Sequence, residues 1–333
     1  MIIDMHTHIA PSHFDHGEGG LSGDFPRTEP DGLGNVSLFA GSDQGRIISD
    51  VCWDSYSRSK QLANLGVDKQ VLSPLPSLLM HELEPIEGAS VARQLNQTIA
   101  SMIQEQPDQF YGLGTAPLQD IDMAIAELSF VKNQGLSGVE IRTNINGANL
   151  GEQRFRPFFQ ECVRLDLAVF VHASNPTFTD RLEHLPQAIA DAATGFPIEC
   201  ALAGASIIWS GLLVDLPDLR ICLSHGGGAL IQSLARGDDT YRKRKPIQEL
   251  LPEPPLEYAR RMWFDDLTFG FDVLRYLVDH VGSQQIVIGS DYSGGGPKQP
   301  TLADEIEYLG LSAAEEENLS SRNALRFLGV DNG

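Results

Sequence analysis

Short apolar runs recur along the chain, and an amphipathic stretch follows most of them. The runs cover residues 1–6, 68–75, 110–117, 137–144, 167–174, 219–226, 261–266 and 284–291. Several are apolar at nearly every position, which is typical of parallel strands that are buried on both faces. Stretches such as 123–134, 154–165 and 271–281 place apolar residues at helical spacing. Strand and helix alternating eight times predict an α/β fold, a (β/α)8 TIM barrel rather than an open sheet.

One segment interrupts this alternation. Residues 11–50 are rich in Gly, Ser, Asp and Pro, and they predict a long insertion after the first strand, with room for a small hairpin. Loops of this length inside a compact domain are usually functional. In a barrel the insertion leaves from the C-terminal face, where active sites lie. We therefore expect a single barrel domain over 1–333, with 11–50 as an insertion over the active site.

Composition limits the classes of protein to which this chain can belong. Of 333 residues, 42% are hydrophobic, which allows a sizeable core. The net charge of −21 argues against nucleic acid as a partner, because a phosphate backbone attracts a basic face. None of the four cysteines has metal-site spacing, and Cys162 and Cys222 lie in apolar stretches, so we expect buried free thiols. With no leader peptide or transmembrane run indicated, we expect a cytoplasmic protein that binds no membrane.

Side chains that bind metals or carry protons stand at the ends of four predicted strands. His6 and His8 end the first strand, His172 the fifth, His225 the sixth and Asp291 the eighth. Residues two apart in a strand point to the same side, so His6 and His8 can bind one ion together. Imidazoles with a carboxylate suit Zn²⁺ or a similar ion, and water bound to such an ion supplies hydroxide near neutral pH.

Each feature alone has an ordinary structural interpretation. An HxH pair is a weak motif, and His172 behind "AVFV" can be a core histidine. Asp291 can simply initiate a turn, and the "HGGG" that starts at His225 can be a tight strand-to-helix connection. Four separate strand ends on one face that carry only such side chains nevertheless favour a metal site. Among the other histidines, His81 is expected at the surface.

The arrangement resembles a known family. Histidines on the first, fifth and sixth strands with an aspartate on the eighth form the ligand pattern of the amidohydrolase superfamily. The chain further resembles the decarboxylase branch typified by aminocarboxymuconate-semialdehyde decarboxylase. The matching segments are, in order, "IDMHTHIAP", "CWDSYSRSKQLANLGVDKQVLSPLP", "FYGLGTAPLQD", "VFVHAS", "PDLRICLSHGGGAL", "IVIGSDY" and "NALRFLG". A match that follows almost the whole chain is far more specific than any single motif.

The resemblance implies a role for individual residues. The implied metal ligands are His6, His8, His172 and Asp291. Zn²⁺ is the implied metal, with Mn²⁺ as the alternative, because related aromatic-acid decarboxylases use Mn²⁺ and often have a glutamate in place of the first histidine. His225 would be the general acid/base beside the metal-bound water, and Asp291 is counted with it among the catalytic residues.

Two arginines match positions at which that branch binds substrate. Arg46, seven residues before Trp53, would hold a substrate carboxylate. Arg236, eleven residues after His225, would reach the active site of the neighbouring subunit, which implies a homodimer. A planar guanidinium binds a carboxylate through two parallel hydrogen bonds, and a strongly acidic protein needs local cations to hold such a substrate. The ordinary alternative is that both are surface residues.

The favoured function is a metal-dependent, non-oxidative decarboxylase. Its substrate would be a small unsaturated or aromatic dicarboxylate from aromatic-ring catabolism, such as a carboxymuconate semialdehyde. The alternative is a hydrolase or hydratase of the same superfamily that acts on a lactone, an amide or an unsaturated keto diacid. Binuclear members use a lysine on the fourth strand, and "GVEIRTN" has none, which favours one metal ion. A metal- or ligand-binding protein without catalysis is the third, least favoured hypothesis.

The chain departs from the family pattern at two strand ends. It has "HASN" at 172–175 where the family typically has "HPWD", and "DYSGGG" at 291–296 where the family has "DYPFP". Gly294 thus stands where an aromatic residue would face the substrate. The metal chemistry therefore transfers from the family better than the identity of the substrate does.

Overall fold

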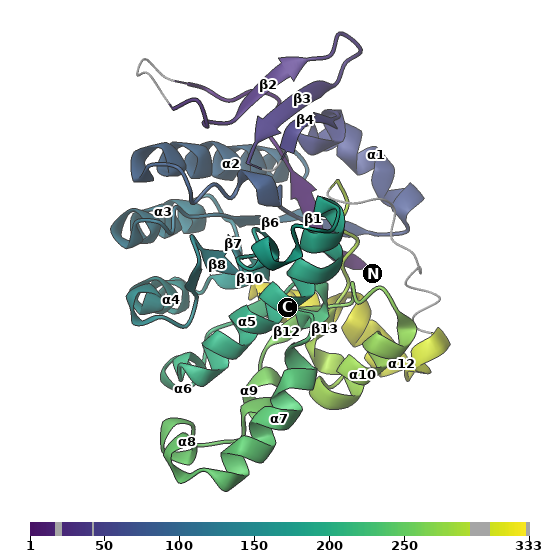
Figure 1. Cartoon of the computed structure of the whole chain (residues 1–333). Coiled ribbons are helices and arrows are strands. Elements are labelled where there is room, and N and C mark those ends of the chain that lie inside the picture. The colour runs from purple at the N-terminus through teal and green to yellow at the C-terminus, as the bar shows by residue number, and fades with distance from the viewer. Residues whose placement is uncertain (17–21, 42, 294–306, 331–333) are drawn as a thin grey trace. The chain divides into compact units, whose positions relative to one another are not determined.

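Eight parallel strands form the centre of the fold (Figure 1). The computed structural model describes residues 1–16, 22–41, 43–293 and 307–330. In sheet order the strands are β1 (Ile3–Ile9), β5 (Lys69–Pro74), β6 (Phe110–Gly114), β7 (Gly138–Arg142), β10 (Ala168–His172), β11 (Ile221–Leu223), β12 (Trp263–Asp265) and β13 (Ile286–Val287). Each overlaps one of the eight apolar runs, so the strand pattern predicted from the sequence is confirmed.

The segment that follows β13 returns to β1. Thr7 and Tyr292 form a parallel bridge. The backbone N–H of Asp291 donates to the carbonyl of His6 at 2.8 Å, and the N–H of His8 donates to the carbonyl of Tyr292 at 2.9 Å. The sheet is therefore nearly closed on itself, with helices around it, as the predicted (β/α)8 barrel requires.

Helices connect most consecutive strands of the barrel. They are α1 (Ser55–Leu65), α2 (Pro85–Glu105), α3 (Ile121–Asn133), α4 (Arg156–Arg164), α5 (Phe196–Trp209), α6 (Leu212–Asp215), α7 (Leu230–Lys243), α8 (Lys245–Leu250), α9 (Pro255–Ala259) and α10 (Phe271–Val281). Two more helices, α12 (Ala313–Glu317) and α13 (Asn323–Leu328), follow the last strand. Local sequence sets several ends. The side chains of Asp54 and Asp120 cap α1 and α3 by accepting a backbone N–H in the first turn, and Gly66 ends α1 with φ 71°.

The predicted insertion contains more structure than a hairpin. Three strands, β2 (Arg27–Pro30), β3 (Val36–Ala40) and β4 (Asp43–Ile48), form an antiparallel sheet. A second small sheet pairs β8 (Asn144–Ile145) with β9 (Ala148–Asn149). Parts of the predicted insertion, 17–21 and 42, lie outside the described residues.

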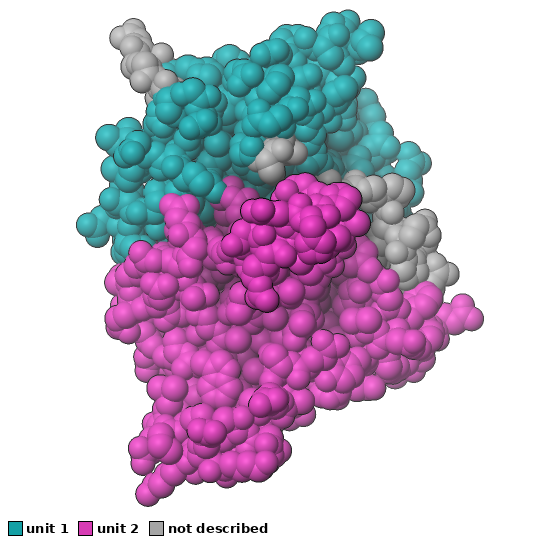
Figure 2. All heavy atoms as spheres, viewed as in Figure 1, with its two compact units in different colours: residues 1–141, 290–298 teal, residues 142–289, 299–333 magenta. Residues whose placement is uncertain are grey.

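Contacts divide the chain into two compact units, coloured separately in Figure 2. Unit 1 comprises 1–141 and 290–298, and unit 2 comprises 142–289 and 299–333. In unit 1 a Cβ on Gly112 of β6 would lie 2.6 Å from the side chain of Ile99, so the glycine allows α2 to pack closely. In unit 2, a Cβ on Gly204 of α5 would lie 2.5 Å from the side chain of Leu230, so this glycine allows Leu230 to pack closely against α5. The single-domain assignment of 1–333 stays a prediction.

One described helical stretch has the length and apolar composition needed to cross a membrane. It runs over Ile189–Trp209. Such a helix is weak evidence for a membrane, because a core helix of a globular protein passes the same test. Gly204, inside this stretch, packs against core side chains of unit 2.

Candidate metal centre

His6 and His8 lie within β1, and both side chains are fully buried. Their position two residues apart in a strand places both rings on one face, as the sequence predicted. The two Nε2 atoms are 3.1 Å apart. The Nδ1 atom of His8 lies 2.9 Å from the carbonyl of Pro74, and since a carbonyl only accepts, the proton sits on Nδ1. The lone pair of His8 is therefore on Nε2, the nitrogen that faces His6 and Asp291.

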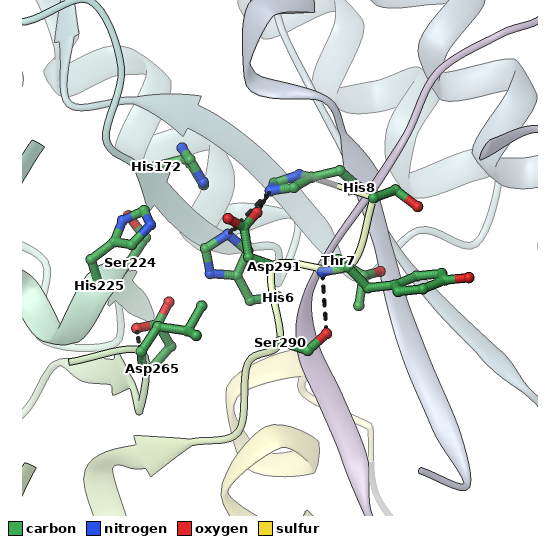
Figure 3. A network of polar contacts seen from close by, with 12 residues as sticks. His6, Thr7, His8, His172, Ser224, His225, Asp265, Ser290 and Asp291 are labelled. Atoms are coloured by element: carbon green, nitrogen blue, oxygen red, sulfur yellow. Dashed lines mark hydrogen bonds and ion pairs between the residues drawn. The ribbon is translucent and has the colours of Figure 1, made fainter. Parts of the chain in front are cut away.

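Asp291 completes this part of the site within unit 1. Its Oδ1 lies 3.1 Å from Nε2 of His8 and 3.8 Å from Nε2 of His6 (Figure 3). Asp291 has a φ of 55°, a left-handed conformation that is uncommon outside glycine. The backbone hydrogen bonds on both sides of Asp291 hold this conformation against β1.

A chain of buried polar groups supports the segment that carries Asp291. Both the backbone N–H and the hydroxyl of Ser290 donate to the carboxylate of Asp4, at 3.0 and 2.6 Å. Gln70 donates to the same carboxylate at 3.2 Å, and the guanidinium of Arg58 donates to Gln70 at 2.8 Å and to the carbonyl of His8 at 2.9 Å. Burial raises the pKa of Asp4 and lowers the pKa of Arg58 to about 10. The network thus links the backbones of two proposed ligands.

His172 is the last residue of β10 in unit 2, and its side chain is buried. Its Nδ1 atom lies 2.8 Å from the carbonyl of Ala173, which places the proton on Nδ1 and the lone pair on Nε2. One ligand atom each from His6, His8, His172 and Asp291 lie within 4.8 Å of one another. These are the four residues expected from the sequence to bind a metal ion, and that role stays a prediction.

The donor set fits a divalent metal ion. In a tetrahedral zinc site with bonds of about 2 Å, neighbouring donor atoms are roughly 3.3 Å apart. The pairs measured within unit 1 are 3.1, 3.1 and 3.8 Å apart, which is close to that spacing. The Nε2 atoms of His6 and His8 are 3.1 Å apart in a buried place, a spacing at which they can share one proton or, with both lone pairs directed inward, bind one cation.

His225 follows β11 and has a left-handed backbone, with a φ of 54°. Its Nδ1 atom lies 2.9 Å from the hydroxyl of Ser224, and its ring lies 5.2 Å from the ring of His172 in an edge-on arrangement. The glycines that follow make this turn possible. A Cβ on Gly228 would lie 2.0 Å from the carbonyl oxygen of Pro197, and the N–H of Gly226 donates to the carboxylate of Asp265 at 2.8 Å.

Glu140 on β7 is a buried acidic residue that the sequence analysis did not single out. Its Oε2 lies 3.8 Å from Nδ1 of His8, and among the described residues neither carboxylate oxygen makes a hydrogen bond of good geometry, the Ser73 hydroxyl being a weaker contact. Burial raises the pKa of this carboxyl group, and the neighbouring His8 lowers it by a smaller amount. The signal in the sequence was an acidic residue between the apolar residues Val139 and Ile141 of a predicted buried strand.

The two predicted substrate-binding arginines lie in different surroundings. Arg46 on β4 is half-buried and donates to the carbonyl of Ser293 at 2.7 Å, so it contacts the segment that carries Asp291. Arg236 lies on α7 with an exposed side chain. Gly294, at the predicted departure from the family pattern, lies outside the described residues.

Other expectations about single residues have mixed outcomes. All four cysteines are free and buried, as predicted for Cys162 and Cys222. Burial raises the pKa of the Cys200 thiol to about 12, so the thiol is unreactive at neutral pH. His81 was expected at the surface, but its side chain is only 3% exposed. It lies in the segment after β5, where His81 and Glu82 stand between Met80 and Leu83 in the sequence. Two adjacent polar residues suggest a surface position, so the sequence does not predict that His81 is buried.

Comparison with known proteins agrees with this geometry. Residues 3–330 match the family model described as Amidohydrolase. The chain belongs to the amidohydrolase family. A relative of this amidohydrolase, the 2-amino-3-carboxymuconate-6-semialdehyde decarboxylase of Dictyostelium discoideum, is 32% identical over 338 residues, which cover 99% of this chain and 92% of the relative.

Solved structures show that the amidohydrolase shares its fold with decarboxylases. Metarhizium anisopliae IDCase in its apo form superposes with a TM-score of 0.82 at 18% identity, covering 99% of this chain and 97% of that chain. The dihydroxybenzoic acid decarboxylase from Polaromonas sp. JS666, solved with bound manganese, superposes with a TM-score of 0.78 at 21% identity, covering 100% and 98%. At this level of identity the likeness shows the fold alone.

Proposed function

We propose that this amidohydrolase is a metal-dependent, non-oxidative decarboxylase. Its substrate is a small unsaturated or aromatic carboxylate, of which a carboxymuconate semialdehyde is the leading candidate. The observation that carries the proposal is the cluster of four ligand atoms within 4.8 Å of one another, with the ring of His225 next to that of His172. The decarboxylase from Dictyostelium, which matches over nearly the full length, supports the choice of reaction.

The proposed ligands are His6, His8, His172 and Asp291. Three imidazoles and one carboxylate favour Zn²⁺, and Mn²⁺ is the alternative. When bound, the ion supplies Lewis-acid polarisation of a substrate oxygen and an acidic water. Burial of β1 keeps bulk water away from His6 and His8, which strengthens electrostatic interactions at this place.

His225 is the proposed proton carrier. When a carboxylate leaves as CO₂, the electron pair of the broken C–C bond stays on the substrate carbon, and a proton must reach that carbon. The contact between Nδ1 of His225 and the hydroxyl of Ser224 orients the ring, so Nε2 is the nitrogen that exchanges the proton with the substrate. The left-handed turn at Gly226 and Gly228 fixes the backbone position from which the His225 side chain projects.

Arg46 and Arg236 are the proposed carboxylate-binding residues. Arg46 contacts Ser293, two residues after Asp291, so its guanidinium can hold a substrate carboxylate beside the metal. The exposed Arg236 is available to a second subunit, and we propose a homodimer in which it completes the partner's site. Four buried free thiols agree with a reducing compartment, and we place the protein in the cytoplasm.

Metal-depleted protein reloaded separately with Zn²⁺ and Mn²⁺ tests the proposal. Each form is incubated with carboxymuconate semialdehydes and hydroxybenzoates, and both CO₂ release and product mass are followed. We expect CO₂ and a product shorter by one carboxylate. Turnover without CO₂ that gives a product heavier by one water would establish the hydratase instead.

A His225→Ala variant tests the role of the proton carrier. We expect metal content equal to that of the wild type and a loss of turnover of about 10²–10⁴-fold. Replacing the exposed His13, which lies in the insertion, by Ala is the matched control and should change neither value. Full turnover in the His225→Ala protein would remove this residue from the mechanism.

A further inference from the structure

Phe269 combines three properties that seldom occur together. Its side chain is 76% exposed despite its size. Its φ of 59° is left-handed, a conformation that bulky side chains rarely adopt. Its ring lies nearly parallel to that of His225, with 16° between the planes and 6.1 Å between the centroids. An exposed ring contributes little to the core, so packing does not explain why this strain is retained, and strain of this kind points to function.

The loop that carries Phe269 is tied to the loop that carries His225. One oxygen of Asp265 accepts the N–H of Gly226 at 2.8 Å and the N–H of Leu267 at 3.2 Å. The hydroxyl of Thr268 donates to the carbonyl of Gly270 at 3.1 Å, which fixes the backbone on the other side of Phe269. The position of one ring relative to the other is therefore set by backbone contacts.

The rings form a continuous series within unit 2. The ring of His172 lies 5.2 Å from that of His225, and the ring of Phe269 lies 6.1 Å from His225. Phe196 lies 6.3 Å from His225 with its plane tilted by 34°. A proposed metal ligand, the proposed proton carrier and an exposed aromatic ring thus follow one another. One face of Phe269 stacks on His225, and the rest of its side chain is accessible to a bound molecule.

We propose that Phe269 is a specificity-determining residue that binds the planar, conjugated part of the substrate against its exposed ring. The inference rests on the proposed function, because it concerns the substrate of the same site. The carbon that loses CO₂ must lie beside His225 to receive its proton. Aromatic pairs are favourable at centroid spacings of about 4.5–7 Å, so a flat substrate that lies against the accessible part of the Phe269 ring gains from it while a puckered one gains less.

Unreactive acids measure this preference without any turnover. We compare the binding of benzoate and cyclohexanecarboxylate to the metal-loaded wild type and to Phe269→Ala by calorimetry. The wild type should favour the flat acid, and Phe269→Ala should lose about 10-fold in affinity for benzoate but little for cyclohexanecarboxylate. With the reactive substrate, KM should rise by a similar factor while kcat stays within about 3-fold.

Thermal unfolding separates a functional from a structural role. At a φ of 59° a glycine is unstrained, so Phe269→Gly should raise Tm by about 2 °C while the preference for benzoate is lost. Phe271 provides the matched control, because its ring stacks on Tyr308 at 4.8 Å and belongs to the next turn of the chain. Phe271→Ala should lower Tm and leave the preference for benzoate unchanged.

Two outcomes would overturn the proposal. One is an unchanged ratio of benzoate to cyclohexanecarboxylate affinity in Phe269→Ala. The other is a change in oligomeric state, seen by light scattering, without a change in binding, which would make Phe269 a contact between subunits. If the wild type releases no CO₂ from any substrate but Phe269→Ala still loses benzoate, the proposed function fails and the role of Phe269 stands.

Discussion

The candidate residues of unit 1 and those of unit 2 are supported in different ways. In unit 1, His6 and His8 lie in a regular, fully buried strand, and the segment of Asp291 hydrogen-bonds to that strand. In unit 2, His225 and Phe269 lie in loops after short strands, both with left-handed backbones. Regular structure places His6 and His8, whereas a strained turn places the proposed proton carrier. Asp291 has a left-handed backbone too, but its segment is hydrogen-bonded to β1.

The difference follows from what each group has to do. A metal ligand must hold a lone pair in a fixed direction, and a strand with a buried network such as that of Asp4 and Arg58 supplies rigidity. A proton carrier and a substrate wall must project into the space where the substrate lies. A tight turn after a strand achieves this, and it requires backbone conformations that only glycine adopts without cost.

The largest expected effect comes from removing a ligand on β1. A structural zinc site is worth about 10–16 kcal/mol over four ligands, so one ligand accounts for roughly 3 kcal/mol. His8→Ala should therefore lose about 10²–10³-fold in zinc affinity, measured by competition with a chelator, and should lose turnover. His16→Ala, which alters an exposed ring, serves as the control. Retained affinity in the His8→Ala protein would contradict the proposed ligand set.

The turn after His225 is the next most sensitive place. In Gly228→Ala the new Cβ meets the carbonyl oxygen of Pro197, and the residue has a φ of 58°. We expect a loss of about 3 kcal/mol in the free energy of unfolding, measured with urea, together with lost turnover. Gly211 has a φ of 74° and open space around it, so Gly211→Ala should lose only about 1 kcal/mol. Equal losses in both variants would mean that the turn is not tightly constrained.

Disruption of the network below Asp291 should have a smaller effect, confined to the metal. Asp4→Asn replaces one acceptor oxygen by a donor, so the hydrogen bonds from Ser290 and Gln70 cannot all persist. We expect zinc affinity to fall about 10-fold with little change in secondary structure by circular dichroism. Asp68 accepts a hydrogen bond from Ile2 near the other end of β1, so Asp68→Asn should leave zinc affinity unchanged. Unaltered affinity in Asp4→Asn would show that Asp291 is positioned by its own backbone bonds alone.

Replacing Glu140 should have the smallest effect, and we expect the replacement to stabilise the metal-free protein rather than destabilise it. Its folded-state pKa lies above the usual 4.5, so its ionisation destabilises the metal-free protein increasingly as pH rises above that value. Glu140→Gln should make the metal-free protein more stable by about 1 kcal/mol at pH 7, and the difference should vanish near pH 4. Urea unfolding of metal-depleted proteins at both pH values measures this.

The control for Glu140 is a buried carboxylate that has partners. Glu127 on α3 accepts hydrogen bonds from Arg93 at 2.7 Å and from Asn96 at 2.8 Å. Glu127→Gln should therefore destabilise the protein at pH 7, the opposite sign from Glu140→Gln. If both variants lose stability, Glu140 has a partner that compensates its charge.

The unit 1 half of the site follows from the sequence with few assumptions. Apolar runs predict the strands, and the spacing of His6 and His8 predicts a shared face because side chains alternate along a strand. The end of β10 likewise predicts where His172 lies. The structure brings these residues and Asp291 together, while their role as ligands stays a prediction.

The rest depends on contacts that spacing does not encode. Glu140 faces His8 only because β7 has a particular register in the barrel. The left-handed φ of Phe269 is set by its neighbours and not by its own preference, which opposes it. The third strand of the insertion, β4, is interrupted by Gly45 and mixes polar with apolar residues, so no alternating pattern announces it.

The hydrogen bonds from Ser290 to Asp4 join residues 286 positions apart in the chain. During synthesis, His6 and His8 therefore emerge from the ribosome long before Asp291 is made. The early histidines spend most of synthesis without it, so a fully formed cation site can arise only when nearly the whole barrel has been translated. Metal binding by all four proposed ligands can therefore occur only at the end of synthesis. A chain truncated before Asp291 would lack one of the proposed ligands.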